Sequence, residues 1–303
     1  MNKKFINQSA QDELIAYITM DKNINKNHDE VLALPAIFHY TSPNAFMSIM
    51  QNSKIWFTDS HFLNDIEEEY HIKDIIKIII EKYSSKYKND VINVLNKYIS
   101  TERLDNKNYK RYVFSCSLAG DELSLWNYYS KKNSLGYSLA FNPKDLYKSF
   151  CEQNENCISL YKCIYDDDEK LNYLVNILDF ADKALDARAF QNKQKNTVLD
   201  LLEENISILS IIFKNKIFST EKEIRFIHNN HNDKSVNYRL LNGILIPYIE
   251  IDFDRKQVLQ SIMIGPGSQD EIILYGAKEF VSTLGLNVNI RDSQIPCRKN
   301  WNN

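Results

Sequence analysis

Three short clusters of polar and aromatic residues carry the side chains best suited to chemistry. The first is "FHYT", in which His39, Tyr40 and Thr41 close a short apolar stretch. A neutral imidazole offers one donor and one acceptor, so His39 can hold a ribose hydroxyl or a carboxamide. A structural histidine is the alternative that the residues leave open. Tyr40 points away from His39 on an ideal strand, where it can belong to the core.

The second cluster lies in "FSCSLAGDELSLWNYYS". Ser115 and Ser117 alternate with apolar neighbours and therefore share one face of their strand. Trp126 and Tyr129 are three residues apart and lie on one face of a helix. Two aromatic side chains on one face indicate either core packing or a stacking platform for a flat ring.

The third cluster is "STEKEIRFI", in which Glu221, Glu223 and Arg225 alternate. On a strand these three side chains would point to the same side. A solvated edge strand is one explanation for such a charged face. The functional interpretation is a carboxylate aimed into a cleft, with its position fixed by the arginine.

Other motifs favour neither a metal nor a phosphate loop. His228 and His231 have no third ligand nearby in the sequence, and "IGPG" lacks the lysine and hydroxyl residue of a phosphate loop. The five cysteines show neither a metal-ligand spacing nor a disulfide framework, so we expect reduced thiols in a cytoplasmic protein. We therefore expect no metal in the site.

The elements that must position these clusters follow from periodicity and punctuation. Strands are predicted at 36–40, 54–59, 111–118, 135–142, 156–167, 221–229, 240–253 (one strand or two), 258–264 and 287–293. Helices are predicted at 42–50, 64–100 with a break near 84–89, 121–132, 168–215 and 270–286, and residues 21–30 are predicted as a loop. Strands and helices do not alternate in βαβ units, which favours an α+β fold.

The order of these elements predicts an N-terminal extension over residues 1–35 and a single domain over residues 36–303. Helical blocks near 66–100 and 168–215 are expected as insertions between strands of one sheet.

The amino-acid composition limits the kinds of partner, such as nucleic acids or membranes, that we expect for this protein. The 303 residues are 44% hydrophobic and 25% charged, with a net charge of −3, which excludes a strongly basic nucleic-acid protein. Clustered lysines at Lys82, Lys86 and Lys88, and at Lys131 and Lys132, leave a local basic surface open. No stretch reaches the roughly 18 apolar residues of a membrane span, and the N-terminus does not resemble a signal peptide. We expect no membrane partner.

Taken in order, these motifs resemble a bacterial family with a domain of unknown function. Its members share an HYT-type strand, an asparagine-aspartate turn (here Asn64 and Asp65), a W-x-x-Y helix and an E-x-E-x-R strand. The resemblance extends from about Ile37 to Gly267. Side-chain bonds from the asparagine and aspartate can organise their own loop, or the two residues can line an acceptor cleft.

The first cluster also resembles the opening of the ADP-ribosyltransferase superfold, through His39, Thr41, "MSIM" and "KIWFTD". The resemblance implies an ADP-ribosyltransferase-like split sheet of mixed, largely antiparallel strands. It also implies NAD as substrate, with ADP-ribose transferred to a protein or nucleic acid. A bacterial toxin or phage-defence (antiviral) effector, with an antitoxin or chaperone as a further partner, is the expected biological role.

The resemblance implies a role for each cluster. Glu223 would stabilise the oxocarbenium-like centre formed when the nicotinamide–ribose bond breaks, and Glu221 would contact the acceptor. His39 would hold a ribose, and Trp126 and Tyr129 would pack against nicotinamide. The remaining contacts to NAD would come from Tyr40, Thr41, Ser115 and Arg225.

Two points stay open within this interpretation. Arg225 would either bind the pyrophosphate or clamp Glu223, because bidentate geometry suits both. Water as the acceptor would make the protein an NAD glycohydrolase. Besides the transferase and the glycohydrolase, the third possible function is a non-catalytic module that binds a nucleotide or a partner.

Overall fold

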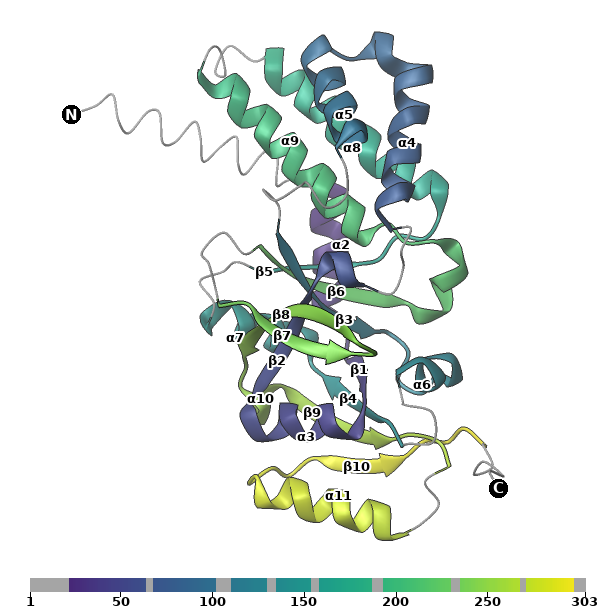
Figure 1. Cartoon of the computed structure of the whole chain (residues 1–303), viewed down its shortest axis with the longest axis vertical. Helices are drawn as coiled ribbons and strands as arrows, with labels where there is room; N and C mark the ends of the chain where they lie inside the picture. The colour runs from purple at the N-terminus through teal and green to yellow at the C-terminus, as the bar shows by residue number, and fades with distance from the viewer. Residues whose placement is uncertain are drawn as a thin grey trace, which may run out of the picture. The chain divides into compact units, whose positions relative to one another are not determined.

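The structure is a computed structural model that describes residues 22–63, 68–101, 110–129, 135–153, 158–186, 193–229, 235–267 and 271–296. The chain divides into two compact units, whose elements are labelled in Figure 1. Unit 1 comprises residues 1–29, 63–110 and 163–218, and unit 2 comprises residues 30–62, 111–162 and 219–303. The two helical blocks expected as insertions therefore belong to one unit, and the strands to the other.

Unit 2 contains a ten-stranded sheet within the described residues. Its strands are β1 (Ile37–Thr41), β2 (Lys54–Asp59), β3 (Arg111–Ser117), β4 (Tyr137–Phe141), β5 (Ile158–Lys162), β6 (Glu223–Asn229), β7 (Asn237–Leu241), β8 (Ile244–Asp252), β9 (Leu259–Ile264) and β10 (Asn289–Asp292). The main path runs β10-β9-β4-β1-β3-β2-β8-β7, while β6 pairs with β3 and β5 with β6. Every pairing is antiparallel except β9–β10. The predicted α+β class with a mixed, largely antiparallel sheet is confirmed.

The sheet divides at β3, because this strand has two neighbours along one edge. The full length of β3 pairs with β6 on one side. On the other side Ser117 pairs with Phe38 of β1, whereas Val113 and Tyr112 pair with β2. Strands β1 and β2 therefore diverge from the same edge, and the described strands form no pair with that edge between Val113 and Ser117. We call this opening the fork.

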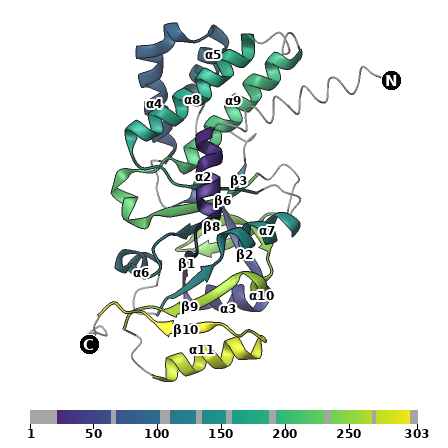
Figure 2. The ribbon, with the colours of Figure 1, turned by 180° about the vertical axis from the view of Figure 1, so that it is seen from behind.

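The main hydrophobic core lies on one face of this sheet. Tyr112, Phe114, Ile224 and Phe226 of β3 and β6 point into it. The helices α3 (Pro43–Asn52), α7 (Pro143–Gln153), α10 (Arg255–Val258) and α11 (Glu271–Thr283) also contribute buried side chains to this core. Strand alternation then sends Val113, Ser115, Glu223 and Arg225 to the opposite face. The view from behind shows α7, α10 and α11 beside the strands (Figure 2).

Local sequence signals explain the first helix of this core. Ser42 is the N-cap of α3 and accepts a hydrogen bond from the amide of Ala45, while Pro43 occupies the first helical turn. Ser53 ends the helix in a left-handed conformation, with φ at 53°. Asn52-Ser53 thus performs the closure that glycine often provides.

The predicted loop at residues 21–30 is wrong, because α2 (Lys22–Leu32) is a helix. Asn and Asp are weak helix formers, and the four asparagine and aspartate residues of α2 obscure the helical periodicity of the segment. Asn27 and Val31, one helical turn apart, are both buried. Glu30 on the same helix pairs with Lys162 of β5 at 2.6 Å. Tertiary packing therefore overrides the weak local preference.

Unit 1 is helical in its described residues. Its main helices are α4 (Glu68–Tyr83), α5 (Asn89–Ser100), α8 (Asp167–Asp186) and α9 (Lys193–Ile212). The predicted break near 84–89 is confirmed, because the 3-10 turn η2 (Ser84–Lys86) separates α4 from α5. Helix α9 contacts α4, α5 and α8, which buries apolar side chains such as Leu202 and Leu209.

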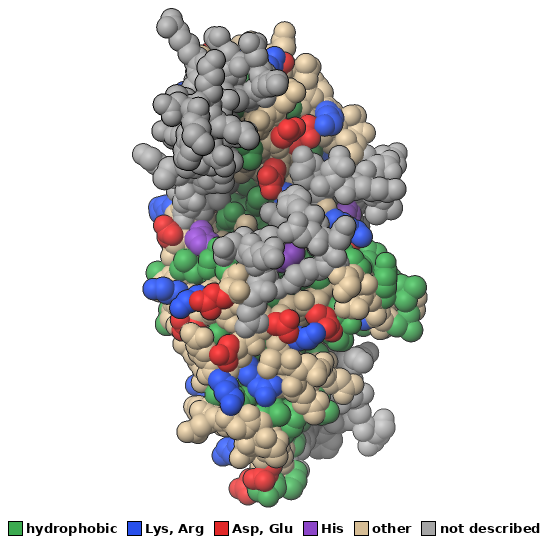
Figure 3. Space-filling model, turned by 90° about the vertical axis from the view of Figure 1, so that its left-hand side faces the viewer, with side chains coloured by type: hydrophobic (Ala, Val, Ile, Leu, Met, Phe, Trp, Pro, Cys, Tyr) green, Lys and Arg blue, Asp and Glu red, His purple; other side chains and the backbone are tan. Residues whose placement is uncertain are grey.

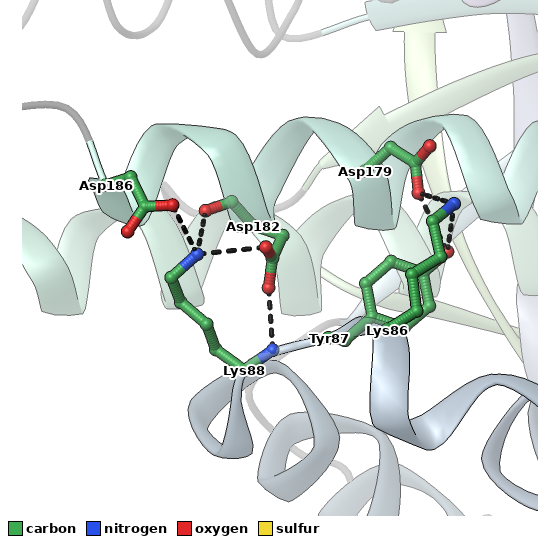
Figure 4. A network of polar contacts seen from close by, with 6 residues as sticks. All are labelled: Lys86, Tyr87, Lys88, Asp179, Asp182 and Asp186. Carbon is green, nitrogen blue, oxygen red and sulfur yellow. Dashed lines mark hydrogen bonds and ion pairs between the residues drawn. The ribbon is translucent and has the colours of Figure 1, made fainter.

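A polar network joins the α4–α5 connection to α8 (Figure 4). The Lys88 amide donates to Asp182 Oδ1 at 2.7 Å, and Lys88 Nζ lies 2.9 Å from Asp182 Oδ2 and 2.8 Å from Asp186 Oδ2. Lys86 Nζ and the Tyr87 hydroxyl both donate to Asp179 Oδ1, at 2.6 and 2.8 Å. Two of the clustered lysines are therefore paired with carboxylates.

Across the part of the chain that the structure describes, every helix is too short or too polar to span a bilayer.

Candidate functional site

His39 occupies the fork. Its Nδ1 lies 2.9 Å from the carbonyl oxygen of Ser115, in the stretch of β3 edge that β1 and β2 leave open. Its ring lies 4.6 Å from the ring of Phe114, measured between centroids. Burial lowers the pKa of His39 to about 4; the bond to Ser115 opposes this effect and the positive charge of Arg239 adds to it. His39 is therefore neutral at physiological pH.

Arg239 on β7 lies beside the fork and was not predicted from the sequence. Its Nη2 donates to Thr58 Oγ1 at 2.9 Å. The guanidinium carbon lies 5.8 Å from the ring centroid of Trp56 and 6.0 Å from that of Tyr248. These two rings are 4.4 Å apart and tilted by 32°. The guanidinium therefore rests on an aromatic pair, a favourable place for a cation.

The charge of Arg239 is not balanced by a carboxylate among the described residues. Its hydrogen bond goes to a hydroxyl and its other contacts are with rings. Burial lowers the pKa of Arg239, but a guanidinium keeps its proton in proteins. A half-buried cation whose charge acts on a neutral imidazole is an arrangement that favours an anionic ligand.

Cross-strand registers place Glu223 and Arg225 of the third predicted cluster on the same sheet face as Arg239. Thr58 pairs with Val113, and Ser115 pairs with Arg225. Directly opposite residues of an antiparallel pair project from the same face. The face that carries Arg239 therefore continues across β3 to Arg225. His39 alternates to the core face of β1, but its ring lies in the fork that separates the two strands.

Glu223 and Arg225 form a buried ion pair. Arg225 Nε donates to Glu223 Oε1 and Nη2 donates to Oε2, both at 2.9 Å. The two residues are 5% and 1% exposed, so water has little access to either charge. Of the two roles left open for Arg225, this bidentate contact is the clamp on Glu223. The Glu223 charge also adds to the effect of burial in raising the pKa of Cys116.

Glu221 does not lie on the strand that was predicted to carry it. It ends the 3-10 helix η5 (Lys216–Glu221), and β6 begins only at Glu223. Lys222 has a φ of 45°, which turns the chain between the two acids. The Ser117 hydroxyl donates to the carbonyl of Glu221 at 2.6 Å and fixes this turn. The strict alternation predicted for the two glutamates is therefore wrong.

Tyr40 and Trp126 belong to a second hydrophobic cluster. Their rings meet edge to face, with centroids 4.7 Å apart, and Trp126 is 2% exposed. The Tyr40 hydroxyl donates to the carbonyl of Ala119 at 2.8 Å, and Trp126 Nε1 donates to Asp121 Oδ1 at 2.8 Å. Burial raises the pKa of Tyr40. These contacts correspond to core packing rather than to an open stacking platform.

The other predicted site residues are dispersed. Thr41 is buried on the core side of β1, and Tyr129 packs partly exposed beside Trp126. His228 is buried on β6. Asn64, Asp65 and His231 lie outside the described residues. No group of three or more metal-ligating side chains occurs within the described ranges.

Sequence reasoning missed Trp56, Thr58, Arg239 and Tyr248. The Asn242-Gly243 dipeptide is a strong hairpin signal, and it would have paired β7 with β8. Its register places Arg239 opposite Ile246, on the same face as Tyr248. The contact with Thr58, 181 residues away in the chain, has no such local signal.

Comparison with known proteins gives one result. The family model described as a protein of unknown function (DUF2971) matches residues 125–226. This segment, about a third of the chain, includes Trp126, Glu223 and Arg225 but neither His39 nor Arg239. No curated protein and no solved structure matches the chain. The predicted domain of unknown function is thus confirmed over this segment.

Proposed function

We propose that unit 2 binds NAD at the fork and transfers its ADP-ribose to a macromolecular acceptor. The observation that supports this proposal best is Arg239, a cation without a carboxylate partner among the described residues, whose positive charge acts on the neutral ring of His39. A pyrophosphate supplies the negative charge that Arg239 lacks. The imidazole can exchange hydrogen bonds with a ribose hydroxyl, because its Nε2 is not used by Ser115.

The sheet face beyond the fork supplies the remaining groups. The half-buried Trp56 ring, packed against the buried Tyr248 ring, offers aromatic surface for a base. Arg225 holds the Glu223 side chain in place. Because a carboxylate oxygen can accept more than one hydrogen bond, a ribose hydroxyl can donate to the same Glu223 oxygen as the guanidinium. In the reaction the nicotinamide–ribose bond breaks, the acceptor nucleophile bonds to the same carbon, and nicotinamide leaves. Glu223 stabilises the positive charge that develops there.

Binding without turnover is the second candidate, and the burial of Glu223 favours it. A carboxylate that is 5% exposed and bonded twice to one guanidinium is well suited to structural support. In that case unit 2 acts as a nucleotide sensor that uses Arg239 and His39 but performs no chemistry.

The binding step is tested by calorimetric titration of the full chain with NAD. We expect Arg239→Gln to weaken binding by about tenfold or more, because a charge-assisted contact is lost. Arg291→Gln is the matched control, since Arg291 is an exposed arginine on β10 of the same sheet. Equal affinity in wild type and Arg239→Gln, or no binding by wild type, would contradict the proposal.

The chemical step is tested by incubating labelled NAD with cell lysate and each protein. We expect labelled macromolecules with wild type and a loss of at least about a hundredfold with Glu223→Gln. Nuclease treatment of the product separates nucleic-acid from protein acceptors. Released nicotinamide without labelled macromolecules would identify a glycohydrolase, and NAD binding without either product would identify the sensor.

A further inference from the structure

The β7–β8 hairpin ends the sheet and is built around a tight turn. Asn242 and Gly243 have φ values of 51° and 83°, the backbone of a type I′ turn. Leu241 pairs with Ile244 across this turn. β7 is the last strand of the main path of the sheet, so its outer edge has no neighbour among the described strands.

The hairpin exposes an unusually apolar surface. Tyr238, Leu240, Leu241, Ile244 and Leu245 are 61%, 71%, 47%, 56% and 63% exposed. By the register of the hairpin, Tyr238, Leu240 and Leu245 project from one face and Leu241 and Ile244 from the other. Together they leave on the order of 500 Å² of apolar area around the edge of the hairpin. Figure 3 shows a group of hydrophobic side chains projecting at its right-hand edge, at the level of this hairpin. We call these five residues the hairpin patch.

The backbone of β7 also directs hydrogen-bonding groups toward its outer edge. In a two-residue hairpin the pair next to the turn, here Leu241–Ile244, exchanges both ladder bonds. Alternation then directs the N–H and C=O groups of Tyr238 and Leu240 away from β8. Pro247 lies opposite Tyr238, at a position where its missing N–H takes no bond from the β7–β8 ladder. The outer edge thus offers two donors and two acceptors.

We propose that a second copy of this chain pairs with the outer edge of β7, so that two sheets join across a two-fold axis. Antiparallel pairing of β7 with itself, centred on Arg239, would satisfy all four exposed groups of each copy. It would also place Tyr238 of one copy beside Leu240 of the other, a favourable aromatic–aliphatic pair. The Arg239 guanidinium is held by Thr58 and two rings of its own chain, away from the axis.

Area and charge favour a second copy over a membrane surface. A standard interface buries about 800 Å² per partner, and exposed apolar side chains on both faces of the hairpin flank the edge that the pairing would cover. Interfacial membrane binding relies on basic residues around the apolar surface. From Asn237 to Asp252, Arg239 is the single basic residue, and it faces the sheet. The five residues of the hairpin patch carry no charge, and the nearest charge, the Arg239 guanidinium, is held by Thr58 and two rings of its own chain.

The test is analytical ultracentrifugation of the full chain over a range of concentrations. We expect a monomer–dimer equilibrium in wild type and a dissociation constant raised at least about tenfold in Leu240→Lys, which buries charge at the axis. Tyr238→Pro removes an outer N–H without touching the β7–β8 ladder, and we expect it to weaken the dimer as well. Tyr275→Lys on α11, replacing a side chain that is 60% exposed, is the matched control.

Cross-linking provides a second measurement of the dimer, which is needed in case Leu240→Lys or Tyr238→Pro fails to fold. Leu240→Cys should be cross-linked to a dimer by a short bismaleimide, whereas Tyr275→Cys and wild type should not. A monomeric wild type at all concentrations, or a dimer that is unchanged in both Leu240→Lys and Tyr238→Pro, would overturn the proposal. Binding of a monomer to anionic vesicles would overturn it in favour of a membrane. None of these outcomes depends on NAD, so this proposal and the proposed function fail separately.

Discussion

Two ion pairs, one in each unit, place their charges in different surroundings. In unit 1, Lys88 is shared between Asp182 and Asp186, whose side chains are 20% and 74% exposed. In unit 2, Arg225 and Glu223 pair with side chains only 2% and 6% exposed. Surface pairs join helices and are screened by water, whereas a buried pair fixes two charges where water cannot replace either partner. Of these two pairs, the first joins α8 to the connection between α4 and α5, and the second holds a carboxylate inside the sheet.

The largest effect should come from breaking the buried pair. Glu223→Ala leaves the Arg225 guanidinium buried without this carboxylate and should lower the free energy of unfolding by about 3–5 kcal/mol. Glu223→Gln keeps an acceptor for Arg225 and should cost about half as much. Urea unfolding followed by tryptophan fluorescence measures this change, because Trp56 and Trp126 both belong to unit 2. A loss below about 1 kcal/mol in Glu223→Ala would show that the pair does not support the fold.

The next largest effect should be a loss of folding stability as the pH is lowered. The folded pKa of His39 is about 4, below the ordinary value of 6.5, because burial disfavours the charged ring. As the pH falls, the unfolded chain takes up this proton first, so stability is complete above pH 6.5 and declines between 6.5 and 4. The decline from this group should total about 2–3 kcal/mol.

The matched variant for the pH effect is His39→Gln, which keeps a donor for the Ser115 carbonyl but does not titrate. Unfolding free energies measured across this pH range should fall less steeply in this variant. Parallel curves for the two proteins would mean that His39 is protonated equally in the folded and unfolded chains.

The smallest effects should come from unit 1. Asp182→Ala removes the acceptor for the Lys88 amide, at the N-cap of α5, and one partner of its ammonium group. We expect a loss of about 1–2 kcal/mol. Asp186→Ala removes only an exposed partner and should cost less than about 0.5 kcal/mol. Thermal unfolding followed by circular dichroism compares them, and equal losses would mean that the amide bond contributes nothing.

Helix signals and strand alternation were predictable from the sequence because they are local. Ser42 and Pro43 begin α3, and the turn at residues 84–86 interrupts the helical pattern where the break was predicted. Periodicity also placed the strand of the third cluster to within two residues. Local rules failed at Lys222, whose left-handed turn depends on Ser117 more than a hundred residues away.

Helix α5, in contrast, is an element that local signals predicted correctly. It begins at Asn89, where the sequence predicts the end of the break, because Val91, Val94 and Leu95 recur at helical spacing and are all buried. A helix that buries one regular face can be predicted from its own residues.

By itself the sequence determined the α+β class, most of the strands, the break between α4 and α5 and the candidate clusters around His39, Trp126 and Glu223. The tertiary structure alone decided that Trp126 is packed in a core, that Glu223 is clamped by Arg225, and that Arg239 lies beside the fork. The physical reason is distance along the chain. Periodicity and turn residues report interactions within a few positions, whereas burial and charge pairing depend on which strands become neighbours.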